Sequence, residues 1–364
     1  MRSVRSSIFT IVAVLVAIGV VMIYSASAIY AYGKMGDSMY FLKRHLLYVL
    51  VGVVMMLLAM SIDINKLKKI AKPSVILCVI LLVLVLIPHI GRETGGAKRW
   101  FRLGMVNFQP SELAKIIIII YIADFVSRKE TLMKSFVYGF LPAVIALALV
   151  VGLILLEPDL GTAVTIFVVA MIMLYVGNVR PRHIMGSFLA SLPLLYVLLF
   201  SVSYRRKRML AFINPWADKR GTGFQIIQSF IALGSGGLFG VGLGQSKQKL
   251  FYLPASHTDF IFSIIGEELG FIGTASIIAL FSLLVWQGMK VAFKALGTFE
   301  RLLSLGIVTM IALEAIINIG VTAGALPTKG LPLPFISYGG SGLIFHLMAV
   351  GLLLNVAKIC ETYQ

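Results

Sequence analysis

The chain has 364 residues, of which 59% are hydrophobic and 13% are charged, and its mean hydropathy is +0.97. Soluble globular proteins of this size carry about twice this share of charged residues, so the composition excludes a soluble protein and indicates a polytopic membrane protein. The 32 lysines and arginines exceed the 15 acidic residues, giving a formal net charge of +17.

Ten apolar runs are long enough to cross a bilayer, which requires about 20 residues in a helix. They lie at roughly 8–30, 44–62, 73–88, 110–127, 134–156, 159–177, 181–203, 259–289, 301–323 and 340–358. An even number of spans places both termini on one side of the membrane. We therefore expect an all-α polytopic membrane protein in which residues 1–364 form a single integral membrane domain.

The first run has features of a cleaved signal peptide, because Arg2 and Arg5 precede an apolar stretch that ends in Ala-Ser-Ala at 26–28. The stretch is long for a signal peptide and many spans follow it, so we expect an uncleaved first helix. Most loop lysines and arginines lie on the same side as Met1, which places both termini in the cytoplasm.

Two outer loops, 89–109 and 204–258, are rich in basic residues and depart from this charge bias. A long loop translocates regardless of its charge, whereas the shorter loop is a real exception. Their basic surface next to the bilayer suggests an anionic partner, although charges solvated beside lipid headgroups explain the same pattern.

Cysteines and histidines give no sign of redox chemistry or of a metal site. Cys78 and Cys360 lie far apart, which argues against a disulfide or a metal framework. The histidines lack the spacing of metal ligands; they are His45, His89, His183, His257 and His346.

Unusual polar residues gather where the even-numbered spans begin. With the amino terminus inside, these helices start at the outer face and direct their positive dipole ends outward. Their starts are Gln109 to Lys115, Glu157 to Thr162, Asp259, and Ser337 to Gly342. An outward cavity lined by backbone donors, lysines and carboxylates suits a phosphate-bearing lipid.

The start of the fourth span contains Glu112 and Lys115, one turn apart on the same helix face. Glu112 alone is explained by the helix dipole. Lys115 precedes five isoleucines, so the two residues predict either an internal ion pair or a lysine that reaches a phosphate. At the start of the sixth span, Glu157 is compatible with a solvated turn, and Asp159 is the better candidate site residue.

Asp259 stands where a polar stretch enters the eighth apolar run. An acid there costs several kcal/mol unless it is paired or used, so we expect it to carry function. Glu267 lies about 12 Å further along a helix, too far to act with Asp259 as a close carboxylate pair. We expect Glu267 and Glu268 to serve helix packing or partner selection, and buried Glu314 to hydrogen-bond Asn318.

The glycine-rich segment 234–244 has the composition of a phosphate-binding loop but not its context. No strand precedes it, and no lysine with serine or threonine follows in the required register, so we expect no nucleotide. Segment 224–233 predicts a short amphipathic helix that lies along the membrane or re-enters it. Segment 326–342, rich in proline and glycine, predicts a rigid outer loop in which Lys329 is either an anion contact or part of an ordinary connection.

Five motifs spread over nearly the whole chain together resemble the SEDS family of shape, elongation, division and sporulation proteins. They are Gly96 to Trp100, Phe108 to Lys115, Glu157 to Ala163, His257 to Phe260 with Gly266 to Gly270, and Pro334 to Gly342. Segments 242–249 and 327–330 look more like the division member FtsW or the sporulation member SpoVE than the elongation member RodA. Ala255 stands where an acid is common in FtsW, so we assign it no role.

The resemblance implies a bacterial peptidoglycan glycosyltransferase that polymerises lipid II at the outer face of the cytoplasmic membrane, at the division septum, with undecaprenyl pyrophosphate as the leaving group. It also implies a class B penicillin-binding protein that supplies the transpeptidase, together with other division proteins, and no nucleic acid. The family's catalytic aspartate corresponds to Asp259.

The expected chemistry agrees with these residues. Asp259 can act as general base, with a pKa raised by partial burial. We expect Arg99, Glu112, Lys115, Asp159 and Lys329 to bind substrate, and a divalent cation such as Mg²⁺ or Mn²⁺ can assist at the phosphates.

Two other classes of function remain open at this point. A transporter that flips a lipid-linked precursor would also use intramembrane Glu112, Lys115 and Asp159, although the sequence shows no pair of repeated halves. A non-catalytic scaffold for the division machinery would use the carboxylates only for packing.

Overall fold

A computed structural model describes residues 2–94, 97–104, 106–201, 203–219, 221–250 and 252–362. All ten predicted runs are helical. Within the described residues, eight segments are long and apolar enough to cross a membrane. They are α1 (Arg2–Met35), α2 (Tyr40–Ser61), α3 (Ile64–Leu86), Phe136–Leu156 with α5 (Leu141–Leu156), α7 (Pro181–Phe200), α10 (Ile261–Lys294), α11 (Thr298–Thr322) and α12 (Ser341–Thr362).

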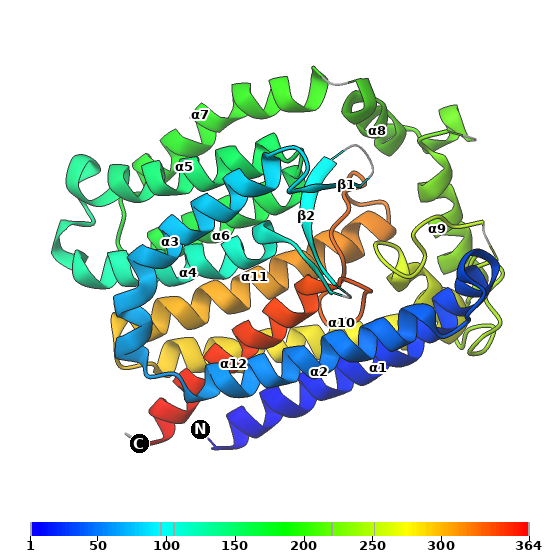
Figure 1. Cartoon of the computed structure of the whole chain (residues 1–364), viewed down its shortest axis with the longest axis horizontal. Coiled ribbons are helices and arrows are strands. Elements are labelled where there is room, and N and C mark those ends of the chain that lie inside the picture. The colour runs from blue at the N-terminus through cyan, green and yellow to red at the C-terminus, as the bar shows by residue number, and fades with distance from the viewer. Residues whose placement is uncertain are drawn as a thin grey trace.

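The other two predicted runs form α4 (Pro110–Arg128) and α6 (Leu160–Val176). Helix α4 is buried along most of its length, including the five isoleucines 116–120. A helix that is apolar on every side is stable only inside a bundle, so α4 lies at the centre of the protein. Both termini lie at the same end of the bundle (Figure 1), which confirms an even number of crossings. We call the opposite end the outer end.

A small antiparallel sheet at the outer end was not expected in an all-α protein. It contains β1 (Arg92–Thr94), β2 (Ala97–Leu103) and β3 (Val106–Phe108) in the order β1-β2-β3. Strands β1 and β3 have three residues each, and the seven residues of β2, Ala-Lys-Arg-Trp-Phe-Arg-Leu, do not alternate between apolar and polar. The sheet is nevertheless important, because β2 carries Arg99 and Trp100 to the outer ends of the helices.

The long outer loop contains α8 (Ser203–Ile213), a 3₁₀ turn at Pro215–Asp218, and α9 (Phe224–Ser235). Helix α9 confirms the predicted short helix. The glycine-rich segment that follows packs against a break in α10, where Gly270 has a φ of 67°. The backbone amide of Val241 donates to the carbonyl of Glu267 at 2.9 Å, and the backbone amide of Phe271 donates to the carbonyl of Gly237 at 2.9 Å. The glycine-rich segment thus supplies hydrogen-bond partners for backbone groups that the break in α10 leaves without a helical partner.

Glu267 and Glu268 fasten the next part of this loop to α10. Glu267 accepts hydrogen bonds from the Ser246 hydroxyl and from the amide of Lys247 at 2.9 Å. Glu268 forms an ion pair with Lys249 at 2.8 Å. These contacts agree with the packing role expected for both glutamates.

Helix α7 stands apart from the bundle, along the upper edge of the view (Figure 1). None of its residues is buried. An apolar cleft of about 200 Å³ lies between α7 and the helices α5 and α6. Its lining is mainly aliphatic, with Phe167 and the single hydroxyl of Ser191, which suits a hydrocarbon chain.

Candidate functional site

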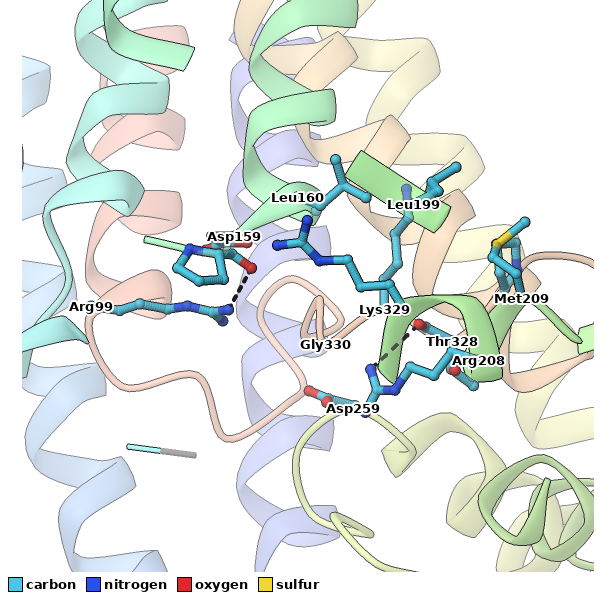
Figure 2. Close-up of a pocket in the computed structure, with 14 residues that line it drawn as sticks. Arg99, Asp159, Leu160, Leu199, Arg208, Met209, Asp259, Thr328, Lys329 and Gly330 are labelled. Atoms are coloured by element: carbon cyan, nitrogen blue, oxygen red, sulfur yellow. Dashed lines mark hydrogen bonds between the residues drawn. The ribbon is translucent and has the colours of Figure 1, made fainter. Parts of the chain in front are cut away.

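A cavity of about 340 Å³ at the outer end brings together charged residues from distant parts of the sequence. We call it the basic cavity. Its charged lining residues come from β2, the α5–α6 turn, α8, the turn before α10 and the loop before α12 (Figure 2); they are Arg99, Asp159, Arg205, Arg208, Asp259 and Lys329. Four of the six predicted site residues therefore converge here.

Asp259 lies two residues before α10, in the turn that leads into this helix, and its side chain is directed into the basic cavity (Figure 2). Burial raises the pKa of this carboxyl to about 6, and the nearby Arg208 guanidinium opposes the shift. A carboxylate with this pKa is mostly ionised at neutral pH and is a stronger base than an ordinary aspartate, as a general base requires.

Three consecutive backbone carbonyls hold this turn in place. The carbonyl of His257 accepts from the amide of Tyr338 at 3.0 Å, and that of Thr258 accepts from the Ser337 hydroxyl at 2.6 Å. The carbonyl of Asp259 accepts from the side chain of Asn318 at 2.9 Å.

The expected pairing of Asn318 with Glu314 is therefore wrong. Asn318 lies on the part of α11 that faces the Asp259 turn, and its Nδ2 atom also donates to the carbonyl of Leu331 at 2.8 Å. The helical spacing indicated a neighbour one turn away, but two backbone carbonyls from other segments occupy the amide.

The segment that carries Lys329 covers Asp259 closely. A Cβ atom on Gly330 would lie 3.1 Å from Oδ2 of Asp259, which is closer than an ordinary contact. Any residue other than glycine at position 330 would therefore require the carboxylate or the loop to move. Burial lowers the pKa of Lys329. Its ammonium faces the basic cavity together with Arg208, whose guanidinium donates to the carbonyl of Thr328 at 3.5 Å (Figure 2).

The α5–α6 turn forms the opposite wall. Arg99 donates to the carbonyls of Glu157 at 2.8 Å and Pro158 at 2.7 Å, which anchors β2 to this turn. Asp159 caps α6, since its carboxylate accepts from the amide of Thr162 at 3.2 Å, and it also accepts from the side chain of Gln109 at 3.1 Å.

Glu157 is not the solvated residue that its turn suggested. Its side chain is fully buried, and neither carboxylate oxygen has a hydrogen-bond partner within the described part of the chain. Burial, together with the neighbouring Asp159 carboxylate, raises the pKa of Glu157 to about 8. Glu157 is therefore mostly protonated at neutral pH.

The sequence left two interpretations of Lys115, an internal ion pair or a contact with a phosphate, and the structure shows the internal ion pair. Its Nζ atom lies 2.9 Å from Glu112 and 2.5 Å from Glu314, and Glu314 also contacts His346 at 2.5 Å. All four side chains are buried. Lys115 does not line the basic cavity, so its contact with a phosphate stays a prediction.

Glu112 lines a second outer cavity of about 470 Å³. We call it the aromatic cavity, because the rings of Tyr48, Trp100 and Tyr338 line it. It shares four lining residues with the basic cavity, which are Arg99, Asp159, Asp259 and Gly330. Asp259 therefore stands in the wall between two cavities.

The apolar cleft between α5, α6 and α7 reaches the same region. Leu160 lines both this cleft and the basic cavity, and Leu198 of the cleft is adjacent in sequence to Leu199 of the basic cavity. A molecule with a hydrocarbon tail in the cleft and an anionic head in the basic cavity would fit this arrangement.

The sequence predicted Arg205 and Arg208 only as members of a basic loop, not as site residues. They lie three residues apart on α8 and share one helix face, and this spacing could have identified them as a pair. The aromatic cavity had no such signal, because its rings come from three separate segments.

A divalent cation remains a prediction. Among the described residues, no group of three or more histidine, cysteine or acidic side chains could hold a metal ion. Mg²⁺ is commonly held by one or two carboxylates and substrate phosphates, and Asp159 and Asp259 on the shared wall fit that donor set.

Residues 5–361 match the family described as cell cycle proteins, which comprises FtsW, RodA and SpoVE. The chain belongs to this family. The SEDS resemblance of its motifs is thereby confirmed. A probable peptidoglycan glycosyltransferase FtsW of Geobacter metallireducens is 50% identical over 343 residues, which are 94% of this chain and 92% of the relative. Stage V sporulation protein E of Bacillus subtilis is 45% identical over 344 residues, 94% of each chain.

Solved structures of the family share this fold. A chain from a study of polymerization and crosslinking by a peptidoglycan synthase complex superposes with a TM-score of 0.80 at 31% identity, over 97% of both chains. The Thermus thermophilus rod shape determining protein RodA gives a TM-score of 0.71 at 28% identity, over 98% of this chain and 97% of RodA. The polytopic helical architecture is therefore that of the FtsW, RodA and SpoVE family.

Proposed function

We propose that this chain is a peptidoglycan glycosyltransferase of the FtsW type that polymerises lipid II at the outer face of the cytoplasmic membrane. The names of its relatives support the activity. The observation that carries the proposal is the position of Asp259, a carboxylate with a raised pKa in the wall between a basic cavity and a second, less basic one.

Asp259 is the general base of the proposed reaction. It takes the proton from an acceptor sugar hydroxyl, and the resulting oxygen attacks the anomeric carbon of the donor sugar. The bond from that carbon to the pyrophosphate oxygen breaks, and its electron pair leaves with undecaprenyl pyrophosphate. One glycosidic bond forms for each sugar–phosphate bond broken, so no other reactant is needed.

Cationic side chains of the basic cavity stabilise the leaving group. Lys329 and Arg208 lie on one side of the cavity and Arg99 on the other (Figure 2), so negative charge developing between them is stabilised from two directions. Asp159, together with the substrate phosphates, would hold a Mg²⁺ or Mn²⁺ ion, which would neutralise further phosphate charge when bound.

The polyprenyl tail of the substrate occupies the apolar cleft beside α7 in this proposal. The cleft opens next to the basic cavity at Leu160, so a lipid can place its head at the site while its tail stays among the helices. This arrangement favours a lipid-linked sugar donor over a soluble one.

We further propose that the protein works with a class B penicillin-binding protein at the division septum, among other division proteins. A related chain occurs in a peptidoglycan synthase complex, which supports a partner that crosslinks the strands.

One assay separates this function from a transporter and from a scaffold. The purified protein with its penicillin-binding partner is given labelled lipid II, and we expect long glycan strands from wild type and none from Asp259→Ala that retains its fold. Transbilayer movement of lipid II without polymer would establish the transporter, and normal polymerisation by Asp259→Ala would exclude this residue as the base.

A further inference from the structure

The two outer cavities differ in the sign of their charge although they share a wall. The basic cavity combines four cations with two carboxylates, namely Arg99, Arg205, Arg208 and Lys329 with Asp159 and Asp259. The described lining of the aromatic cavity combines one cation with three carboxylates, namely Arg99 with Glu112, Asp159 and Asp259. Even if Glu112 is counted as neutralised by Lys115, negative charge still exceeds positive charge there.

The remaining lining of the aromatic cavity is suited to an uncharged polar molecule. The rings of Tyr48, Trp100 and Tyr338 offer aromatic surface, which stacks on the apolar faces of sugar rings. Asn107 and Gln109 also line the cavity, and the side-chain amide of Gln109 donates to Ser111 and Asp159. An amide side chain both donates and accepts hydrogen bonds, so Asn107 matches the hydroxyl and acetamido groups of a saccharide.

We infer that the aromatic cavity is the subsite for the acceptor saccharide, while the basic cavity holds the pyrophosphate of the donor. This inference rests on the proposed function and assigns its two substrates to different sides of Asp259. A pyrophosphate is attracted to four cations and repelled by a surplus of carboxylates, so it favours the basic cavity. The reacting end of the acceptor carries no phosphate, so it forms no favourable charge interaction with the cations of the basic cavity and does not need to lie there.

The position of Asp259 agrees with this division. The base must contact the acceptor hydroxyl, while the bond that breaks must point toward the cations. A residue in the shared wall meets both conditions, because its carboxylate borders the acceptor on one side and the donor on the other. The opposite assignment would place the leaving pyrophosphate beside Glu112.

Two probes that each carry half of the substrate chemistry test the assignment. One is undecaprenyl pyrophosphate, which has no sugar, and the other is the peptidoglycan disaccharide without lipid or phosphate. Binding of each probe is measured for the full-length protein in nanodiscs with its penicillin-binding partner. We expect Trp100→Ala to weaken disaccharide binding about tenfold, equivalent to about 1.4 kcal/mol, and to leave pyrophosphate binding within about twofold. Lys329→Ala should weaken pyrophosphate binding about tenfold and leave disaccharide binding within about twofold.

Trp216→Ala serves as the control, because Trp216 is an exposed tryptophan on a different outer loop, between α8 and α9, and lines neither cavity. It should leave both probes bound as in wild type. The inference is overturned if Trp100→Ala weakens the pyrophosphate at least as much as the disaccharide, or if wild type does not bind the disaccharide while still polymerising lipid II. Failure of the wild type to polymerise lipid II would instead remove the proposed function itself.

Discussion

The side-chain amide of Asn318 joins the Asp259 turn to the loop that covers it. Its Nδ2 atom donates to the carbonyls of Asp259 at 2.9 Å and Leu331 at 2.8 Å, and the residue is buried. Because Leu331 follows Lys329 and Gly330 directly, one amide fixes the proposed base relative to the loop that carries Lys329. Asn318 is therefore a positioning residue.

Replacing Asn318 should impair catalysis more than binding. Asn318→Ala leaves two buried carbonyls without a donor, which costs about 1–3 kcal/mol each in free energy of unfolding if no water enters. We expect kcat for lipid II polymerisation to fall at least about tenfold, with a smaller change in KM, because Asp259 loses its orientation.

Asn355 provides a control for this prediction. Its side chain also donates to two carbonyls, those of Ala59 at 3.0 Å and Ile62 at 2.6 Å, but it lies at the opposite end of the bundle. Asn355→Ala should lower the melting temperature by a similar amount without a comparable loss of kcat. Equal losses of activity in the two variants would show that Asn318 acts only through stability.

Activity should depend on the ionisation of Asp259. Its pKa of about 6 means that the base is lost as pH falls through 6, so kcat/KM should decline below that pH and level off above it. The raised pKa also means that ionisation opposes folding, so this residue's contribution to stability is present at low pH and is lost as pH rises toward 6.

Asp259→Asn should accordingly abolish polymerisation while leaving the melting temperature at pH 7.5 unchanged or higher. Asp218→Asn is a suitable control, since Asp218 is an exposed acid on the same outer side. A pH profile of wild type that stays flat between pH 5 and pH 7, values chosen to bracket a pKa of about 6, would contradict the assignment of the base.

Glu157 should make the protein less stable in alkaline solution. Its folded-state pKa of about 8 lies above the ordinary value of 4.5, so its stabilising contribution is complete below pH 4.5 and is lost as pH rises through 8. Melting temperatures of wild type and Glu157→Gln should therefore converge in acid and diverge above neutrality, with the variant more stable. Glu130→Gln, at an exposed glutamate, should track wild type at every pH.

Gly330→Ala should reduce activity by moving the proposed base. The added methyl group would lie 3.1 Å from Oδ2 of Asp259, closer than an ordinary contact, so the carboxylate or the loop must shift. We expect kcat to fall by about tenfold or more, since small displacements of reacting groups have large effects on rate. Gly186→Ala on α7 meets nothing within 4 Å and should leave kcat unchanged.

Lys115→Ala should destabilise the protein strongly. It removes the cation between Glu112 and Glu314, and breaking a buried ion pair from one side costs about 3–5 kcal/mol. The melting temperature and the yield of folded protein should both fall. If the variant instead melts like wild type but uses lipid II poorly, Lys115 contacts the phosphate after all.

The sequence predicted the spans well because they depend on local composition. A run of about 20 apolar residues can satisfy its backbone inside a bilayer only as a helix, whatever surrounds it. The same local logic identified α9, the non-helical segment that ends before α12, and Asp259 as an acid in an apolar setting. It missed the small sheet, because two of its strands have only three residues and the third does not alternate between apolar and polar residues.

The partners of the charged residues needed the tertiary structure. Lys115 meets Glu314 across 199 residues of sequence, and Asn318 meets Asp259 across 59. Such contacts depend on how helices pack and rotate, which no spacing within one helix encodes. The sequence alone thus determined where the membrane-spanning helices lie and singled out Asp259 as the candidate base. Only the fold decided that this base stands between two cavities of opposite charge, because their walls are assembled from segments far apart in the chain.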